Sequence, residues 1–156
     1  CLDDELKLLE IGSAESMTES GDILILAIGS MVYPSLEAVK TLKKMGIDAE
    51  VIDARFVKPL DEKMLKKKFL DYDKVVTVEE NTLNGGFGSA VLEFIEKENI
   101  KTVSVKRMGL PDKFVTHGTQ QELRAMYDLN PAGIAKTTEN FFKGNLEGEV
   151  WHPKNA

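Results

Sequence analysis

The chain has 156 residues, of which 42% are hydrophobic and 29% are charged, and its formal net charge at pH 7 is −6. This composition fits one globular domain with a hydrophobic core, and it excludes disordered and membrane-embedded classes. The acidic balance also argues against nucleic-acid partners, because phosphate backbones attract basic surfaces.

Cys1 is the only cysteine, so the sequence offers neither a disulfide framework within the chain nor a multi-cysteine metal site. A chain that begins with cysteine rather than methionine suggests a fragment, or a start left by processing or cloning. The sequence contains no signal-peptide core and no apolar stretch of about 18 residues. We therefore expect a cytoplasmic protein without a membrane partner.

The first half of the chain alternates short apolar runs with helix-like stretches. The run Ile23–Ile28 is typical of a strand that is buried on both faces. A helix is predicted next, with a proline near its start and a glycine after its end, from the spacing of Leu36, Val39, Leu42 and Met45 between Pro34 and Gly46. Ala49–Asp53 predicts a second strand, and Asp61 is the predicted N-cap of a helix whose apolar face is Leu60, Met64, Leu65 and Phe69.

The second half continues this alternation. Lys74–Val78 predicts a third strand, and a glycine-rich turn then leads into a helix with an apolar stripe of Phe87, Val91, Leu92 and Ile95. Val103 and Val105 mark a fourth strand. The residues from Thr119 to Glu122 have the spacing of a capping box. A last helix is predicted to start at Asn130 and Pro131 and to end near Phe142.

The order of these elements predicts the fold class. Strands of about five residues that alternate with helices favour an α/β fold, in which helices cover both faces of a parallel sheet. Leu6–Ile11 is a candidate for an additional edge strand. Residues 144–156 contain two glycines, a proline and few apolar residues, so we expect a domain over residues 1–143 and an irregular tail over residues 144–156.

The stretch 75–98 holds the candidate functional residues, beginning with the turn Gly85-Gly86-Phe87-Gly88. Glycines at a strand-to-helix turn can direct backbone N–H groups at a phosphate. The spacing here matches neither of the common phosphate-binding patterns, and the preceding Glu79 and Glu80 would repel an anion. A structural role in tight turning and close helix–strand approach is therefore favoured over nucleotide binding.

Glu79 and Glu80 raise a second possibility, that of an acid and a base with tuned pKa values. Adjacent strand residues point to opposite faces, however, so the two are not a natural catalytic pair. Their position at the carboxyl end of a parallel strand favours a site or a contact role. A solvated, charged loop is the alternative.

The two histidines, His117 and His152, give little support to a metal cluster, because His152 lies in the predicted tail. His117 immediately precedes Gly118 and a predicted helix start. Local hydrogen bonding is the more common role of such a histidine, and a contact at a subunit boundary is the alternative.

Other polar side chains do not form a recognisable catalytic group. Ser30 and Ser89 both follow glycines, but neither lies in a G-x-S-x-G motif, so hydrolase chemistry is not supported. Arg55 and Lys58 can bind an anion or form local or interface ion pairs with neighbouring carboxylates.

Several segments together resemble the C-terminal domain of the 1-deoxy-D-xylulose-5-phosphate synthases, a family of transketolase-like thiamine diphosphate enzymes. The matching segments are LAIGSMV, GIDAEVIDARFVKPLD, VVTVEENTLNGGFGSAVLEF, MGLPDKFVTHGTQQEL and LNPAGI, within residues 10–142. Transketolases and the β subunits of 2-oxo-acid dehydrogenases share the strand–helix–RF-KPLD–EEN–GGFG order more loosely. The segment GLPD-F-HG followed by a capped helix is more similar to the synthases.

The resemblance implies a three-layer α/β/α sandwich with a mixed, mostly parallel five-stranded sheet, in which Leu6–Ile11 would supply the antiparallel strand. In such enzymes the preceding domains bind thiamine diphosphate and Mg²⁺ through a GDG-type motif. This chain has no GDG, so no catalytic, cofactor-binding or metal-binding residue is expected in it. The family's reaction, condensation of pyruvate with glyceraldehyde 3-phosphate and loss of CO₂, would belong to the parent enzyme.

The resemblance also implies that this domain contacts the other domains of the parent enzyme and a second copy in a homodimer. The interface candidates are Glu79, Glu80, Asn81, Gly85, Gly86, Phe87, Gly88, Arg55, Lys58 and His117. We expect small residues in the glycine turn to admit another protein surface, and Phe87 to belong to an exposed apolar patch. The alternative functions are the equivalent domain of another transketolase or 2-oxo-acid dehydrogenase, or a separate module that binds a small anion.

Overall fold

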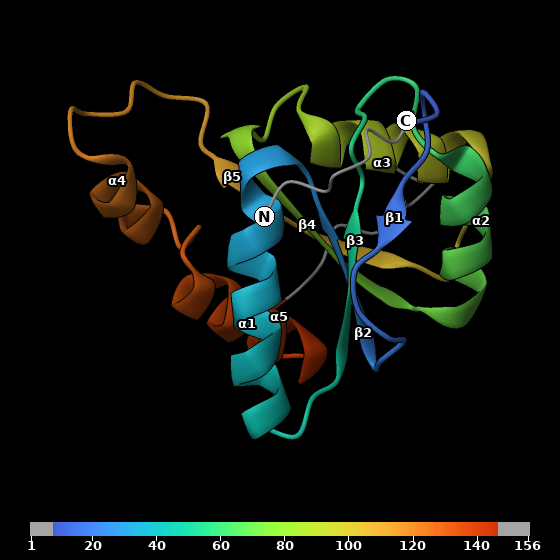
Figure 1. Ribbon diagram of the computed structural model, residues 1–156, viewed down its shortest axis with the longest axis horizontal. Coiled ribbons are helices and arrows are strands. Elements are labelled where there is room, and N and C mark those ends of the chain that lie inside the picture. Colours follow the sequence, from blue (N-terminus) through green and yellow to red (C-terminus); the bar gives the residue numbers. More distant parts are fainter. Residues whose placement is uncertain (1–7, 147–156) are drawn as a thin grey trace.

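A computed structural model of the chain, described here for residues 8–146, contains one five-stranded sheet (Figure 1). Across the sheet the strands lie in the order β1 (Glu15–Ser16), β3 (Ala49–Asp53), β2 (Ile23–Ala27), β4 (Lys74–Thr82) and β5 (Ser104–Leu110). β1 is antiparallel to β3, and the other neighbouring strands are parallel. The sheet is therefore mixed and mostly parallel, as predicted.

Helices cover both faces of the sheet. They are the 3₁₀ turn η1 (Gly29–Met31), α1 (Val32–Lys44), α2 (Glu62–Asp71), α3 (Phe87–Lys97), α4 (Gln120–Met126) and α5 (Pro131–Phe142). One core lies between the sheet and the pair α1 and α5, and a second core lies between the sheet and the pair α2 and α3. The predicted three-layer α/β/α sandwich is confirmed. No helix in residues 8–146 is long and apolar enough to cross a membrane.

The central strand β2 explains why the two cores form. Ile23, Ile25 and Ala27 point into the core beneath α1 and α5, whereas Leu24 and Leu26 point into the core beneath α2 and α3. All five residues are fully buried. A strand with a helical layer on each side needs apolar residues at every position, which accounts for the uninterrupted run in the sequence.

The prediction of an edge strand at Leu6–Ile11 is wrong for its described part. Residues 8–11 form no strand, and the side chains of Leu8 and Ile11 are exposed; residues 6 and 7 lie outside the described residues. The antiparallel strand is β1, a few residues later and polar. It is fixed by its pairing with β3 and by a hydrogen bond from the Met17 N–H to the Val51 carbonyl, which its composition does not reveal.

The predicted helix caps are confirmed. Asp61 accepts a hydrogen bond from the Met64 N–H at 2.9 Å, and Thr119 forms the expected capping box with Glu122. Asn130 accepts from a backbone N–H in the first turn of α5, and Pro131 is the first residue of that helix. Residues 144–146 follow α5 without helical structure, and the rest of the predicted tail lies outside the described residues.

Candidate interface at the carboxyl edge of the sheet

The carboxyl ends of β2 and β4 lie side by side in the middle of the sheet. After β2 the chain forms β3 on one side of β2, and it then crosses to form β4 on the other side of β2 and β5 beyond it. The strand order therefore reverses between β2 and β4. Open α/β sheets commonly place functional groups there. A hollow of about 230 Å³ at this edge is lined by Ile28, Gly29, Ser30, Val57, Glu79, Glu80, Asn81, Gly85, Gly86 and Phe87. It brings together six of the predicted candidates.

Glu79 is buried, with 1% of its surface exposed, although it carries a carboxylate. Its two oxygens accept hydrogen bonds from the Phe87 N–H at 2.7 Å and from the Gly88 N–H at 2.8 Å. The first two N–H groups of α3 are therefore already hydrogen-bonded to an anion of the domain itself, the Glu79 carboxylate. This helix end does not fit the diphosphate of a cofactor, since that group would have to share the site with a buried carboxylate.

The glycines allow α3 to approach β4 closely, which confirms their structural interpretation. A Cβ on Gly86 would lie 2.1 Å from a carboxylate oxygen of Glu79 and 2.3 Å from the Thr82 carbonyl oxygen. A Cβ on Gly88 would lie 2.7 Å from the Thr77 hydroxyl oxygen. Atoms of the domain itself thus occupy the space beside both glycines. Gly85, in contrast, is exposed and has a positive φ of 74°.

The prediction that Phe87 belongs to an exposed apolar patch is wrong. Its side chain is 1% exposed and packs in the core beneath α2 and α3. The hydrogen bond from its N–H to Glu79 holds the first turn of α3 against the sheet, so the ring points inward.

Glu80 lies on the opposite side of β4 from Glu79, as the alternation of a strand predicts. Its carboxylate accepts hydrogen bonds from Arg124 of α4, from Nε at 3.0 Å and from Nη2 at 2.6 Å. The hydroxyl of Ser30 and the amide of Gln120 also donate to it. The Arg124 guanidinium, with help from Ser30, keeps the pKa of Glu80 below its usual value. Glu80 is therefore an ionised anchor for α4, rather than a group that exchanges protons near neutral pH.

The basic candidates and the histidine lie outside this hollow. Arg55 forms an ion pair with Glu15 of β1, and its Nε is 4.0 Å from a carboxylate oxygen of Asp53. The local ion pair, one of its two predicted roles, is therefore present. Lys58 is exposed in the loop before α2, and His117 is exposed in the loop between β5 and α4.

Asn81, Gly85 and Gly88 complete the set of candidates. Asn81 is exposed at the carboxyl end of β4, and its side-chain oxygen accepts a hydrogen bond from the Thr82 N–H at 2.8 Å. Gly88 lies inside the domain beneath the Glu79 carboxylate. The structure therefore divides the predicted surface into an exposed part, which includes Asn81 and Gly85, and a buried part.

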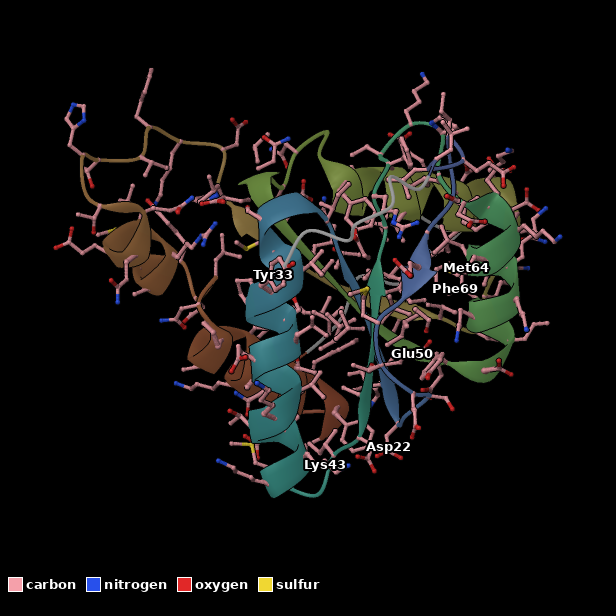
Figure 2. The ribbon with its side chains drawn as sticks, viewed as in Figure 1. Asp22, Tyr33, Lys43, Glu50, Met64 and Phe69 are labelled. Carbon is pink, nitrogen blue, oxygen red and sulfur yellow. The ribbon has the colours of Figure 1, made fainter. Side chains whose placement is uncertain are left out.

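A polar cluster around Glu50 was missed by the sequence analysis. Glu50 of β3, which is labelled in Figure 2, is 1% exposed. Lys68 of α2 donates to both of its carboxylate oxygens, at 2.5 and 2.7 Å. The hydroxyls of Ser16 and Tyr72 also donate to this carboxylate. No local motif reveals these contacts, because they join residues 18 to 34 positions apart.

The charge of Glu50 is stabilised by these partners. Burial acts to raise the pKa of Glu50, but the hydrogen bonds from Lys68, Ser16 and Tyr72 outweigh it and bring the pKa below its usual value. Burial and the neighbouring Glu50 raise the pKa of Tyr72 to about 12. The cluster is therefore a structural ion pair between the sheet and α2. Within residues 8–146, no three His, Cys, Asp or Glu side chains gather as a metal site.

The geometry can be compared with known proteins. Residues 12–134 match the family described as "Transketolase, C-terminal domain". The chain belongs to this family. It is similar to a split-gene transketolase, described as an inactive beta4 tetramer, with 32% identity and a TM-score of 0.79 over 86% of this chain and 44% of that one. A transketolase mutant from Pichia stipitis, 18% identical with a TM-score of 0.63 over 93% of this chain and 20% of that one, shares the fold.

Curated relatives are more similar in sequence. The chain is 42% identical over 155 residues to 1-deoxy-D-xylulose-5-phosphate synthase of Halothermothrix orenii, which covers 99% of this chain and 24% of that protein. It is 50% identical over 140 residues to 1-deoxy-D-xylulose-5-phosphate synthase 1 of Geobacter sulfurreducens, which covers 90% of this chain and 22% of that protein. The chain thus spans less than a quarter of the length of these relatives, which are larger enzymes.

Proposed function

We propose that this transketolase C-terminal domain is the assembly domain of a 1-deoxy-D-xylulose-5-phosphate synthase. The parent enzyme would condense pyruvate with glyceraldehyde 3-phosphate and release CO₂, which supplies a precursor for isoprenoid, thiamine and pyridoxal biosynthesis. The observation that carries this proposal is the 42 to 50% identity to two curated synthases over nearly the whole chain. The transketolase structures are 18 to 32% identical, so the synthases are the better supported members of the family.

The chemistry would take place outside this domain. Thiamine diphosphate and Mg²⁺ would be bound by other parts of the parent enzyme, and the domain would contact those parts and a second copy in a homodimer. The occupied N-terminus of α3 supports this division, because Glu79 fills the position where an anion would bind. The same contact weighs against the alternative of a separate anion-binding module.

A graft tests the proposal. The matching segment of the Geobacter sulfurreducens synthase would be replaced by this chain, and CO₂ release from pyruvate would be measured with and without glyceraldehyde 3-phosphate. We expect thiamine diphosphate-dependent activity that needs both substrates, whereas the relative without its C-terminal segment should be inactive. A graft that binds thiamine diphosphate and has the molecular mass of the intact relative, yet forms no product, would contradict the proposal.

A further inference from the structure

The segment between β5 and α5 has no core of its own. None of the residues 111–128 is buried, and α4, which has seven residues, buries no side chain. Figure 1 shows this loop and helix standing away from the sheet and its covering helices. The chain rejoins the core at Leu129, which is fully buried. Residues 112–126, called here the α4 strap, therefore gain little stability from apolar packing.

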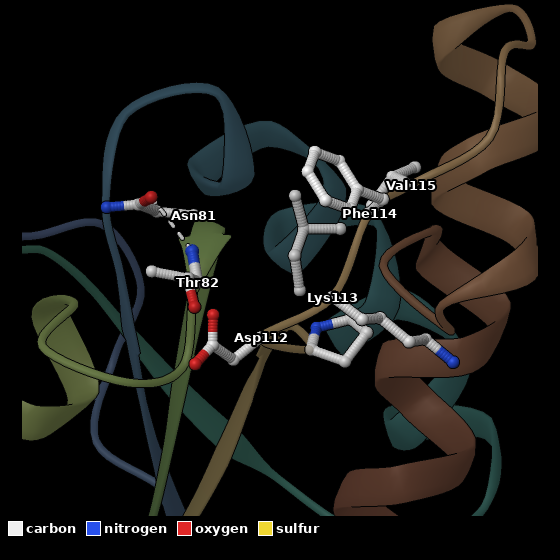
Figure 3. Close-up of a pocket in the computed structure, with 8 residues that line it drawn as sticks. Asn81, Thr82, Asp112, Lys113, Phe114 and Val115 are labelled. Carbon is white, nitrogen blue, oxygen red and sulfur yellow. Dashed lines mark hydrogen bonds between the residues drawn. The ribbon is translucent and has the colours of Figure 1, made fainter.

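Open space borders both halves of the α4 strap. A hollow of about 660 Å³ lies between its first residues and the end of β4. Figure 3 shows the Phe114 ring at one side of this hollow, with the side chains of Thr82 and Asp112 at the other. A second hollow, of about 480 Å³, separates α4 from the first residues of α1 and α5, and its lining includes Pro34 and Pro131. The strap thus spans the surface of the domain and does not fill it.

The contacts that fasten the strap are polar, and Glu80 makes the strongest of them. Arg124 of α4 donates to both Glu80 carboxylate oxygens, at 3.0 and 2.6 Å, and the Gln120 amide donates at 3.2 Å. Near the start of the strap, the Asn84 amide donates to Asp112 at 3.3 Å, in an exposed position. Hydrogen bonds to a charged group are the stronger kind, so the ion pair with Arg124 is the main attachment of α4 to the sheet.

The two ends of the strap are fixed to the domain. At one end, the Leu83 N–H donates to the Leu110 carbonyl at 2.9 Å. At the other end, a Cβ on Gly133 would lie 2.5 Å from the Asp128 carbonyl oxygen, so the first turn of α5 packs directly against residue 128. Movement of the segment is therefore confined to the residues between these two ends.

We propose that the α4 strap opens and closes on the domain as one unit, with Glu80 as its latch. Opening breaks the contacts of Glu80 with Arg124 and Gln120, but it transfers no buried apolar side chain to water. Released from the sheet, α4 melts, because a helix of seven residues is marginal in water without a packing partner. Opening also uncovers the hollow between α1, α4 and α5. This device would operate whatever reaction the parent enzyme catalyses.

Hydrogen exchange of single amides in the 156-residue chain, followed by NMR, measures the opening. The Leu123 N–H, which donates to the Thr119 carbonyl at 3.0 Å, reports on α4, and Ile25 of the central strand β2 reports on the core. We expect the Leu123 amide to be at least about a hundredfold less protected than that of Ile25. Low urea concentrations should hardly change its exchange, because a local opening exposes little surface.

Glu80→Ala tests the latch. Glu80 lies on β4, outside the strap, so its substitution acts on α4 only through the lost contacts. We expect exchange of the Leu123 amide to become at least about tenfold faster. Glu62→Ala is the matched control, since it removes an exposed ion pair with Lys97 and should change this exchange by less than about twofold. An unchanged exchange in Glu80→Ala would overturn the assignment of the latch.

Arg124→Ala identifies the partner in the latch. Alanine is the best helix former, so this substitution cannot weaken α4 through helix propensity. Exchange of the Leu123 amide should again be faster, and the double variant with Glu80→Ala should exchange little faster than the faster single variant, because both remove the same contact. Two effects that multiply in the double variant would mean that the pair is not the latch.

Leu42→Ala tests whether the strap moves separately from the core. Leu42 is buried on α1 and keeps its contacts whether the strap is closed or open. Its loss should therefore speed exchange of the Ile25 amide and leave that of Leu123 within about twofold. If the exchange of Leu123 rises by the same factor as that of Ile25, α4 opens only when the whole domain unfolds, and the strap does not exist as a separate unit.

Discussion

Glu50 shows how a single buried carboxylate can join two layers of the domain. It lies on β3, receives three partners from β1, α2 and the residue after α2, and keeps its charge through their hydrogen bonds. A buried ion pair contributes little compared with a well-packed apolar pair, but removing one member is costly, because the other remains uncompensated. The stability of the domain should therefore depend on the ionisation of Glu50.

Glu50→Gln tests this dependence on pH. The folded-state pKa of Glu50 lies below its ordinary value of 4.5, so its contribution is present above that value and is lost as pH falls through the folded-state pKa. We expect the substitution to lower the free energy of unfolding by about 2 kcal/mol near neutral pH. The difference from the unsubstituted chain should shrink as the pH falls.

Urea unfolding between about pH 7 and about pH 3 measures this difference. Glu19→Gln is the control, because Glu19 is exposed before β2 and should change the unfolding free energy by less than about 0.5 kcal/mol. A pH-independent difference between the unsubstituted chain and Glu50→Gln would show that the charge of Glu50 is not what stabilises the cluster.

Residue roles were predictable only where the partners are near in sequence. The opposite orientations of Glu79 and Glu80 follow from the period of a strand. The partners of Glu79 are eight and nine positions away, within the motif that the sequence analysis singled out. Glu80 bonds to Arg124, which is 44 positions away on a different element, and no local pattern indicates that pair.

At the scale of elements, α3 can begin close to β4 because Gly86 and Gly88 have no side chains. Gly86→Ala should destabilise the domain by about 2 kcal/mol or more, because its Cβ would overlap the buried carboxylate of Glu79 and a backbone carbonyl. Gly85→Asn is the control, since Gly85 has open space around it and Asn tolerates a positive φ.

Thermal and urea unfolding of the two variants measure this effect. We expect a clearly lower midpoint for Gly86→Ala and a small change for Gly85→Asn. Equal midpoints for Gly86→Ala and the unsubstituted chain would mean that α3 can move away from β4 without loss, and the close approach would then have no energetic role.

The elements that were predicted correctly are those whose own residues contain a recognisable pattern, such as a helix cap. The caps of α2, α4 and α5 depend on residues within three positions of each helix start, and all three are present. β1 has no such signal, because two polar residues become a strand only through their pairing with β3. The apolar residues at Leu8 and Leu9 led to the wrong position, since apolar content without a packing partner does not define a strand.

At the scale of the whole molecule, one sheet separates two cores and belongs to both. A loss on either face should therefore weaken the entire domain. Leu42→Ala on the buried face of α1 and Phe94→Ala on the buried face of α3 should each lower the unfolding free energy by about 2 to 5 kcal/mol. We expect one cooperative transition in both variants.

Circular dichroism and hydrogen exchange of residues in α1 and α3 provide the two probes. Their transitions should coincide in each variant. If Phe94→Ala releases α3 while α1 remains protected, the two faces fold separately, and the sheet does not couple them.

The architecture was predictable because strand and helix signals alternate regularly, and that order leaves few ways to arrange the chain. The exposed position of residues 111–128 was not predictable on the same grounds. Phe114 and Val115 are two apolar residues in an otherwise mostly polar loop, and no spacing in the sequence indicates that the side chain of Phe114 is fully exposed. Hydrophobic periodicity identifies residues that are buried within their own fold, and an irregular exposed segment has no such periodicity.

The carboxylate of Glu79 has one more consequence for this fold. This carboxylate is covalently part of the chain, so it has a high effective concentration at the N–H groups of Phe87 and Gly88. It therefore competes strongly with any free anion for these two groups. A free phosphate ester would have to displace it and leave it buried without partners. We therefore expect the Glu79 carboxylate to keep these two N–H groups occupied when phosphate esters are present, so that the glycine turn keeps its shape.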